Sequence, residues 1–179
     1  TGLFVSLMDM TLDDGRGDLV VLQKNILLSA IASGIAAVKS CSFQGFWLLS
    51  RTLEKNSKFL AFRVDQNGLF VAPFSSSDTG QNVDEVAQIK ISPDGQKVAC
   101  TYFAMDSFYV STYQFNPYTS GAVSNPSLLG ALGYPFAFYG VEFSPNGRFL
   151  YVSGEFQGAG RLLQFDLEAG DLAAVKNSQ

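Results

Sequence analysis

The densest group of side chains that could do chemistry is a loop of carboxylates near the start of the chain. Asp13, Asp14 and Asp18 fall in a short stretch that also holds Gly15 and Gly17. Hard cations such as Ca²⁺ bind several oxygen ligands presented by a tight glycine-containing turn, so these residues are a candidate calcium site. Their spacing lacks the EF-hand pattern, and aspartates also stabilise polar hairpin turns. We therefore favour a hairpin loop without a metal ion.

Histidine, the commonest proton-transfer residue in enzymes, does not occur in the sequence. Its absence removes the Ser-His-Asp and Cys-His arrangements, histidine-ligated metals and the commonest general base. Any catalysis would have to rest on carboxylates, lysines or tyrosines. No set of acid, base and nucleophile converges in the sequence, so we expect a protein that is not an enzyme and has no cofactor.

Aromatic side chains are the best candidates for ligand contacts. Tyr134, Phe136, Phe138 and Tyr139 form one cluster, and large aromatic rings dominate the energetics of both cores and interfaces. Packing in the core is the default interpretation of this cluster, and contact with a ligand near the central channel is the functional hypothesis for it. For Trp47 the same two interpretations exist, and there we favour packing.

Composition limits the function classes further. The 179 residues are 47% hydrophobic and only 16% charged, and the net charge is −4. A phosphate backbone requires clustered Lys and Arg, so we expect no nucleic-acid partner. The longest apolar stretch, residues 26–38, is shorter than the roughly 20 residues of a membrane-spanning helix, so we expect no membrane insertion.

Two cysteines, Cys41 and Cys100, are the only ones present. Two sulfurs alone cannot form a structural zinc site of the usual kind. A disulfide between them is possible, but we favour free cysteines buried in strands.

Segments of the sequence repeat one another about 50 residues apart. Residues 88–95 end in Ser-Pro-Asp-Gly, residues 140–147 end in Ser-Pro-Asn-Gly, and residues 45–65 hold a weaker copy. Each copy begins with alternating apolar and polar residues, which is typical of a strand with one buried face. Pro presets the turn and Gly closes it. Four short strands in each repeat of this length are typical of a β-propeller blade.

We predict an all-β chain of about three and a half four-stranded antiparallel propeller blades. The predicted blades cover residues 36–82, 83–135 and 136–179, and residues 1–35 form the second half of an earlier blade, with strands at 3–10 and 18–28. The fourth strand of the last blade is predicted at residues 172–175, and essentially no helix is expected. Because propellers close with 4 to 8 blades, this ring is incomplete, and we expect a longer natural domain or completion by another copy.

The early motifs resemble those of seven-bladed, WD40-like propeller domains in large secreted Bacteroidota proteins. That family runs approximately D-M-T-L-N-G-G-x-G-D-V, then K-N, A-V-K-H-C and an aromatic-W motif ending in Ser or Thr followed by His. The matching segments here are residues 9–12, 15–20, 24–25, 37–41 and 46–51. Ser40 and Arg51 stand where the family commonly has His, so a histidine site of that family is not expected here.

The resemblance implies an extracellular or cell-surface protein connected with gliding motility or type IX secretion. We therefore expect a non-catalytic module for interaction or display, whose partner is another part of the same large protein, another surface protein or a glycan. One alternative is a lactonase-like propeller enzyme that uses acidic residues near the channel. Glu142 and Lys90 occupy corresponding outward positions, but one is an acid and the other a base, so they form no repeated site. The second alternative is a structural spacer in a surface filament.

Overall fold

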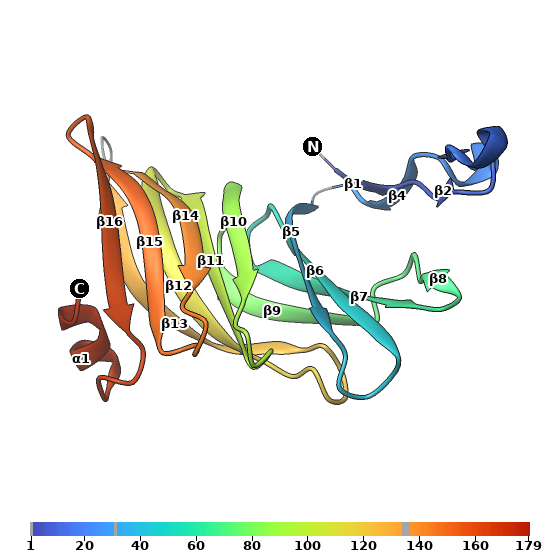
Figure 1. Ribbon diagram of the computed structural model, residues 1–179. Coiled ribbons are helices and arrows are strands. Elements are labelled where there is room, and N and C mark those ends of the chain that lie inside the picture. The colour runs from blue at the N-terminus through green and yellow to red at the C-terminus, as the bar shows by residue number, and fades with distance from the viewer. Residues whose placement is uncertain (1, 31, 134–136) are drawn as a thin grey trace.

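Three antiparallel sheets stand side by side in the computed structural model, which describes residues 2–30, 32–133 and 137–179 (Figure 1). The first sheet contains β5 (Ala32–Lys39), β6 (Gly45–Thr52), β7 (Ser57–Asp65), β8 (Gly68–Leu69) and β9 (Ser75–Gln81), the last two both paired with β7. The second contains β10 (Glu85–Ile91), β11 (Lys97–Ala104), β12 (Ser107–Phe115) and β13 (Val123–Gly133). The third contains β14 (Ala137–Phe143), β15 (Phe149–Phe156) and β16 (Ala159–Asp166). The predicted all-β class with antiparallel blades is confirmed.

The N-terminal segment extends from the first sheet as an arm of paired short strands (Figure 1). Its elements are β1 (Leu3–Val5) paired with β4 (Ile26–Ser29), β2 (Met8–Asp9) paired with β3 (Asp18–Leu19), and the 3₁₀ turns Asp13–Gly15 and Val21–Gln23. Leu3 and Leu28 pack against the buried Phe62 of the first sheet. The strands predicted near residues 3–10 and 18–28 therefore occur as an antiparallel pair, although short turns interrupt it.

The Ser-Pro-Asp-Gly and Ser-Pro-Asn-Gly segments form matching tight turns after β10 and β14. Ser92 Oγ accepts a hydrogen bond from the Lys97 N–H at 2.9 Å, and Ser144 Oγ accepts one from the Phe149 N–H at 2.9 Å. The turn glycine has a φ of +69° in the first turn. Glycine is favoured there because other residues rarely adopt a left-handed backbone. The repeat in the sequence thus sets the start of the second strand in each sheet.

Apolar faces between neighbouring sheets form the two larger cores. One lies between the first and second sheets and includes Trp47 and Ile89, and the other lies between the second and third sheets and includes Val110 and Phe165. Trp47 is 1% exposed, which confirms its predicted packing between blades. The second sheet lies between these two cores, and its strand β11 is accordingly buried on both faces.

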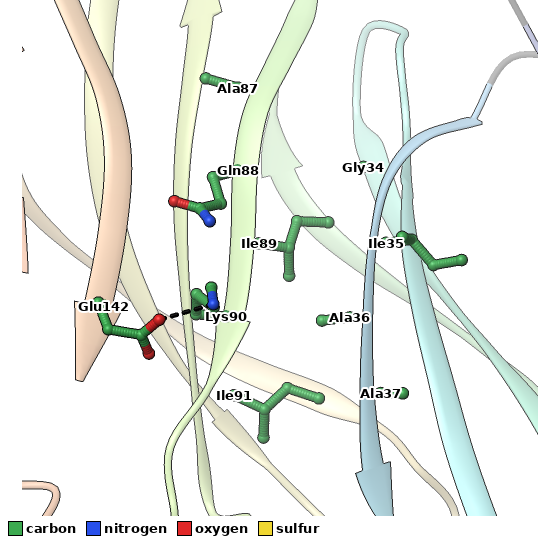
Figure 2. A pocket seen from close by; sticks show the side chains of 10 residues that line it. All are labelled: Gly34, Ile35, Ala36, Ala37, Ala87, Gln88, Ile89, Lys90, Ile91 and Glu142. Carbon is green, nitrogen blue, oxygen red and sulfur yellow. Dashed lines mark ion pairs between the residues drawn. The ribbon is translucent and has the colours of Figure 1, made fainter. Parts of the chain in front are cut away.

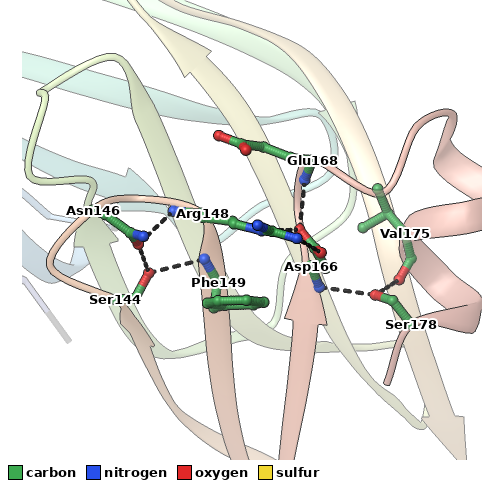
Figure 3. A network of polar contacts seen from close by, with 8 residues as sticks. All are labelled: Ser144, Asn146, Arg148, Phe149, Asp166, Glu168, Val175 and Ser178. Atoms are coloured by element: carbon green, nitrogen blue, oxygen red, sulfur yellow. Dashed lines mark hydrogen bonds and ion pairs between the residues drawn. The ribbon is translucent and has the colours of Figure 1, made fainter.

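The chain ends in a helix where a fourth strand was predicted for the last blade. Residues 172–175 lie in α1 (Leu172–Asn177), so that prediction is wrong. Asp171 caps the helix by accepting a hydrogen bond from the Ala174 N–H, and the Leu-Ala-Ala run favours helix. Val175 fills the core between the second and third sheets, and Ser178 Oγ accepts a hydrogen bond from the Asp166 N–H of β16 (Figure 3). No helix in the described ranges is long and apolar enough to cross a membrane.

An ion pair at the surface joins the turn before β15 to β16 beside this helix (Figure 3). Arg148 donates to both carboxylate oxygens of Asp166, at 3.1 and 2.6 Å, and these hydrogen bonds hold the pKa of Asp166 below its usual value of 3.8. A lowered carboxyl pKa in the folded state gives stability that is present above the usual pKa and is lost as the pH falls through the folded value.

We therefore expect Arg148→Met to destabilise the protein slightly at pH 7 and hardly at all at about pH 2. Urea unfolding of both proteins at the two pH values measures the difference. A loss that is equal at both values would show that Arg148 acts by packing instead.

The two cysteines are free, and they differ in accessibility. Cys100 is buried in β11, whereas Cys41 is exposed in the turn after β5. The prediction of free thiols is confirmed, but the predicted burial is wrong for Cys41.

We expect a thiol reagent such as DTNB to label only Cys41 in the folded protein and both cysteines in guanidinium chloride. Burial also raises the pKa of Cys100, which lowers its reactivity further. Rapid labelling of both thiols without denaturant would contradict this.

Candidate functional site: the groove along the innermost strands

Each innermost strand contains a β-bulge at the same level. Two residues of the strand stand opposite one residue of its neighbour: 34–35 opposite Ser50 in the first sheet, 87–88 opposite Thr101 in the second, and 139–140 opposite Ser153 in the third. β-Bulges are enriched at rims and beside functional sites, where they redirect side chains. Because the bulge recurs at the same level in all three innermost strands, this part of the strands is the candidate functional site.

At the bulges some backbone groups lose their hydrogen bonds to the neighbouring strand, and hydroxyl side chains bind these groups instead. Ser50 Oγ donates to Gly34 O at 2.7 Å. Thr101 Oγ1 donates to Tyr139 O at 2.6 Å, and this bond crosses from the second sheet to the third. The three hydroxyl residues opposite the bulges, Ser50, Thr101 and Ser153, lie about 50 residues apart in the sequence. The repeat period therefore indicates them, but alternation of apolar and polar residues does not, because a bulge leaves no mark in that pattern.

The bulge of β14 is held most completely. The Gly140 N–H donates to Ser153 Oγ at 3.0 Å, and the Val141 N–H donates to Gln88 Oε1 at 2.7 Å. Together with Thr101, these contacts fix three consecutive backbone groups from three different strands. Tyr139, which the bulge presents, is thereby held on a rigid scaffold.

We expect Thr101→Val to lower the free energy of unfolding by about 1–3 kcal/mol, because the Tyr139 carbonyl loses its partner. Amide exchange at Gly140 and Val141 should also become faster. Thr101→Ser is the control, since it keeps the hydroxyl, and it should restore slow exchange. Unchanged exchange in Thr101→Val would show that the bulge does not depend on this bond.

A groove of about 480 Å³ runs between β5 and β10 beside these bulges (Figure 2). Its lining residues are Gly34, Ile35, Ala36, Ala37, Ala87, Gln88, Ile89, Lys90, Ile91 and Glu142. Figure 2 shows Ile89 and Ile91 pointing toward β5, and Gln88 and Lys90 on the side of β14. The groove thus has an apolar floor and a polar side.

An ion pair stands at the polar side of the groove. Lys90 Nζ lies 2.6 Å from Glu142 Oε2, and their side chains are 36% and 59% exposed. The pairing joins β10 to β14 and leaves the groove without net charge from these two residues. The sequence placed both at corresponding outward positions but did not indicate that they meet.

The aromatic cluster divides between core and surface. Tyr139 is 53% exposed, whereas Phe138 is 3% exposed and packs in the core between the second and third sheets. Phe138 thus packs behind β14, whereas the Tyr139 side chain is exposed and is not among the residues that line the groove, so its contact with a ligand stays a prediction. Tyr134 and Phe136 lie outside the described residues.

The acidic loop lies on the arm, far along the chain from the groove. Asp13 and Asp14 form a short 3₁₀ turn, and Asp18 Oδ1 accepts a hydrogen bond from the Leu19 N–H. Over the residues that the structure describes, no cluster of three or more acidic or sulfur ligands is placed to hold a metal ion.

Arg51, at the position where the resembling family commonly has His, is fully buried. It lies between the first and second sheets, in contact with Tyr102 and Gln81. It therefore belongs to the core and not to the groove.

Solved structures of β-propeller type are similar to this chain. Puromycin hydrolase matches 94% of the chain with a TM-score of 0.55 and 16% identity. Putative 6-phosphogluconolactonases from Bacteroides uniformis and Bacteroides fragilis match 90% of it, with TM-scores of 0.53 and 0.52 and identities of 17% and 15%. The chain spans 26% of the hydrolase and 47% of each lactonase. No protein-family model and no curated protein matches the sequence.

These similarities define the fold. The chain forms antiparallel blades of a β-propeller-type structure, arranged as an open ring segment. β5, β10 and β14 are the innermost strands of their blades, and the groove lies along them.

Proposed function

We propose that the chain is a non-catalytic interaction module that binds its ligand in the groove along β5, β10 and β14. The observation that carries this proposal is the level row of three bulges beside a concave, partly apolar groove. Sites held on rigid strands bind with little loss of conformational entropy. The Lys90–Glu142 pair gives the groove one donor group and one acceptor group.

We further propose that the module works at the cell surface or outside the cell, with another surface protein or a glycan as partner. The support is the resemblance of residues 9–51 to propeller domains of secreted Bacteroidota proteins, including WD40-like proteins linked to gliding motility and type IX secretion. A role as a spacer in a surface filament is compatible with the same motifs. Loss of all binding in groove variants would separate the binding role from the spacer role.

A hydrolytic enzyme is the second candidate function, and the similar structures favour it, since their names are those of a hydrolase and of putative lactonases. At 15–17% identity this likeness supports only the fold. In the groove, Glu142 could act as a base only if it left Lys90, because the ion pair occupies its carboxylate.

The test compares binding and turnover in one preparation. The purified chain is incubated with a panel of lactones and aminoacyl ester substrates, and the same chain is applied to a glycan array and to immobilised surface proteins. We expect binding without turnover above the uncatalysed rate. Turnover that disappears in Glu142→Gln, while the protein remains folded, would overturn the non-catalytic proposal.

A further inference from the structure

The backbone of the groove offers both kinds of hydrogen-bonding group. Among the described residues, β5 and β10 each pair with a strand on one side only, namely β6 and β11. Their inner edges therefore present alternating N–H and C=O groups to the groove. Gly34 and Ala36 line the groove on the β5 side, and at Gly34 the side chains of Val86 and Ile89 pack against the backbone.

The charged groups add one donor and one acceptor without net charge. Lys90 and Glu142 neutralise each other at 2.6 Å. A ligand with a phosphate or carboxylate would gain Lys90 but face Glu142 and the strand carbonyls. A ligand with an ammonium group would face Lys90 and the strand N–H groups. Neutral groups that both donate and accept, as hydroxyls do, satisfy the whole set.

An extended peptide fits less well, although it also carries alternating donors and acceptors. The bulges at 34–35 and 87–88 interrupt both edges at the level of the groove, and bulges prevent regular strand addition.

The floor supplies an apolar contact. Ile89 and Ile91 point toward β5 in Figure 2, with Ala36 opposite them. Ile89 is 2% exposed and belongs to the core, so the half-buried Ile91 is the isoleucine on which the C–H face of a sugar ring can lie while its hydroxyls reach the strand edges.

We propose that the ligand of this groove is a neutral polyhydroxylated molecule, that is, an uncharged saccharide unit of a glycan. This inference rests on the proposed binding function and narrows it to one chemical class. Gln88 and the Lys90–Glu142 pair are the side chains that select it.

Titration calorimetry and saturation-transfer NMR on the folded chain test this with three kinds of probe. The neutral probes are maltotriose, chitotriose and a panel of further uncharged trisaccharides; the anionic probe is 6-phosphogluconate; the peptide probe is a Val-Thr octapeptide. We expect saturable binding of at least one neutral trisaccharide and weaker or absent binding of the other two probes. Glu142→Gln should weaken binding of the neutral trisaccharide about tenfold, because a charged hydrogen-bond acceptor is replaced by a neutral one.

Two further variants locate the site. Ala36→Leu should block the groove and abolish saccharide binding, and thermal unfolding checks that it folds. Lys90→Met should weaken saccharide binding as Glu142→Gln does. If Ala36→Leu does not fold, a normally folded Glu142→Gln protein still tests the inference. Arg148→Met is the matched control, since it removes another surface ion pair of the third sheet and should leave binding unchanged.

Each outcome has a defined meaning. Tighter binding of 6-phosphogluconate or of the peptide, lost in Ala36→Leu, would overturn the saccharide inference and leave the binding function standing. Failure of every neutral trisaccharide to bind would also overturn the inference. Turnover of a lactone would overturn the proposed function itself.

Discussion

Arg51→Ala should lower the free energy of unfolding by about 3–5 kcal/mol, as expected for removal of a large, fully buried side chain. The Arg51 side chain fills the boundary between the first and second sheets. Its guanidinium lies 4.3 Å from the centre of the Tyr102 ring and 5.1 Å from that of Phe59. It also donates to Gln81 Oε1 at 2.9 Å. Alanine would leave a cavity and deprive this amide of a charged donor.

Among the residues that the structure describes, no carboxylate forms an ion pair with this guanidinium. The Cys100 thiol lies 3.5 Å from it, and burial raises the pKa of that thiol despite Arg51, so the thiol stays neutral at pH 7. The aromatic faces and side-chain oxygens must therefore hold the positive charge. Replacing such a buried ion by an apolar residue of similar volume is often neutral or stabilising.

Arg51→Met is therefore the decisive comparison. It keeps most of the volume and removes the charge, and we expect it to lose less than half as much stability as Arg51→Ala. Chemical denaturation monitored by circular dichroism gives both values. If Arg51→Met were as unstable as Arg51→Ala, the hydrogen bonds and ring contacts of the guanidinium would be indispensable, and burial of volume would not explain the site.

The repeat in the sequence carries the fold because each blade uses the same turn and the same alternation. Ser92 and Ser144 make identical bonds in matching turns, so a local pattern was sufficient to locate β10, β11, β14 and β15. Where the local pattern is ambiguous, tertiary packing decides. Residues 172–175 are predicted as the fourth strand of the last blade, but burial of Val175 together with the Asp171 cap stabilises a helix there.

The candidate site was harder to predict, since it depends on contacts between blades. The sequence places Tyr139 among the candidate ligand-contact residues by its aromatic character and by its position beside an innermost strand. Its support from Thr101, Gln88 and Ser153 comes from three strands that no local pattern connects. Likewise, the Lys90–Glu142 pair forms only because β10 and β14 lie side by side. Period-2 alternation also cannot show a bulge, which shifts the pairing by one residue.

Trp47→Ala should cost a similar 3–5 kcal/mol and should separate the first two blades. Trp47 belongs to β6, but its indole N–H donates to Pro117 O in the turn after β12, at 3.0 Å. Its ring also contacts Phe43 and Phe74, with centroids 5.1 and 5.3 Å away. Trp47→Phe is the control: it keeps an aromatic ring and should lose only about 1 kcal/mol, through the missing indole hydrogen bond, since Pro117 O keeps the bond that it accepts from the Cys41 N–H.

A substitution at Gly121, in the second blade, tests the contact between Trp47 and the turn after β12 from the opposite side. Its φ is +62°, and a Cβ atom there would lie 2.9 Å from the Trp47 ring. Gly121→Ala should therefore destabilise the wild-type protein by backbone strain and by close contact with both the ring and the Ala61 Cβ, 3.0 Å away, but should destabilise Trp47→Ala without the overlap with the ring. A double-mutant cycle measures the difference as a coupling energy, which we expect to be about 1 kcal/mol. If the two effects were strictly additive, the turn after β12 would not pack on Trp47 in solution, and this contact could not be what joins the first two blades.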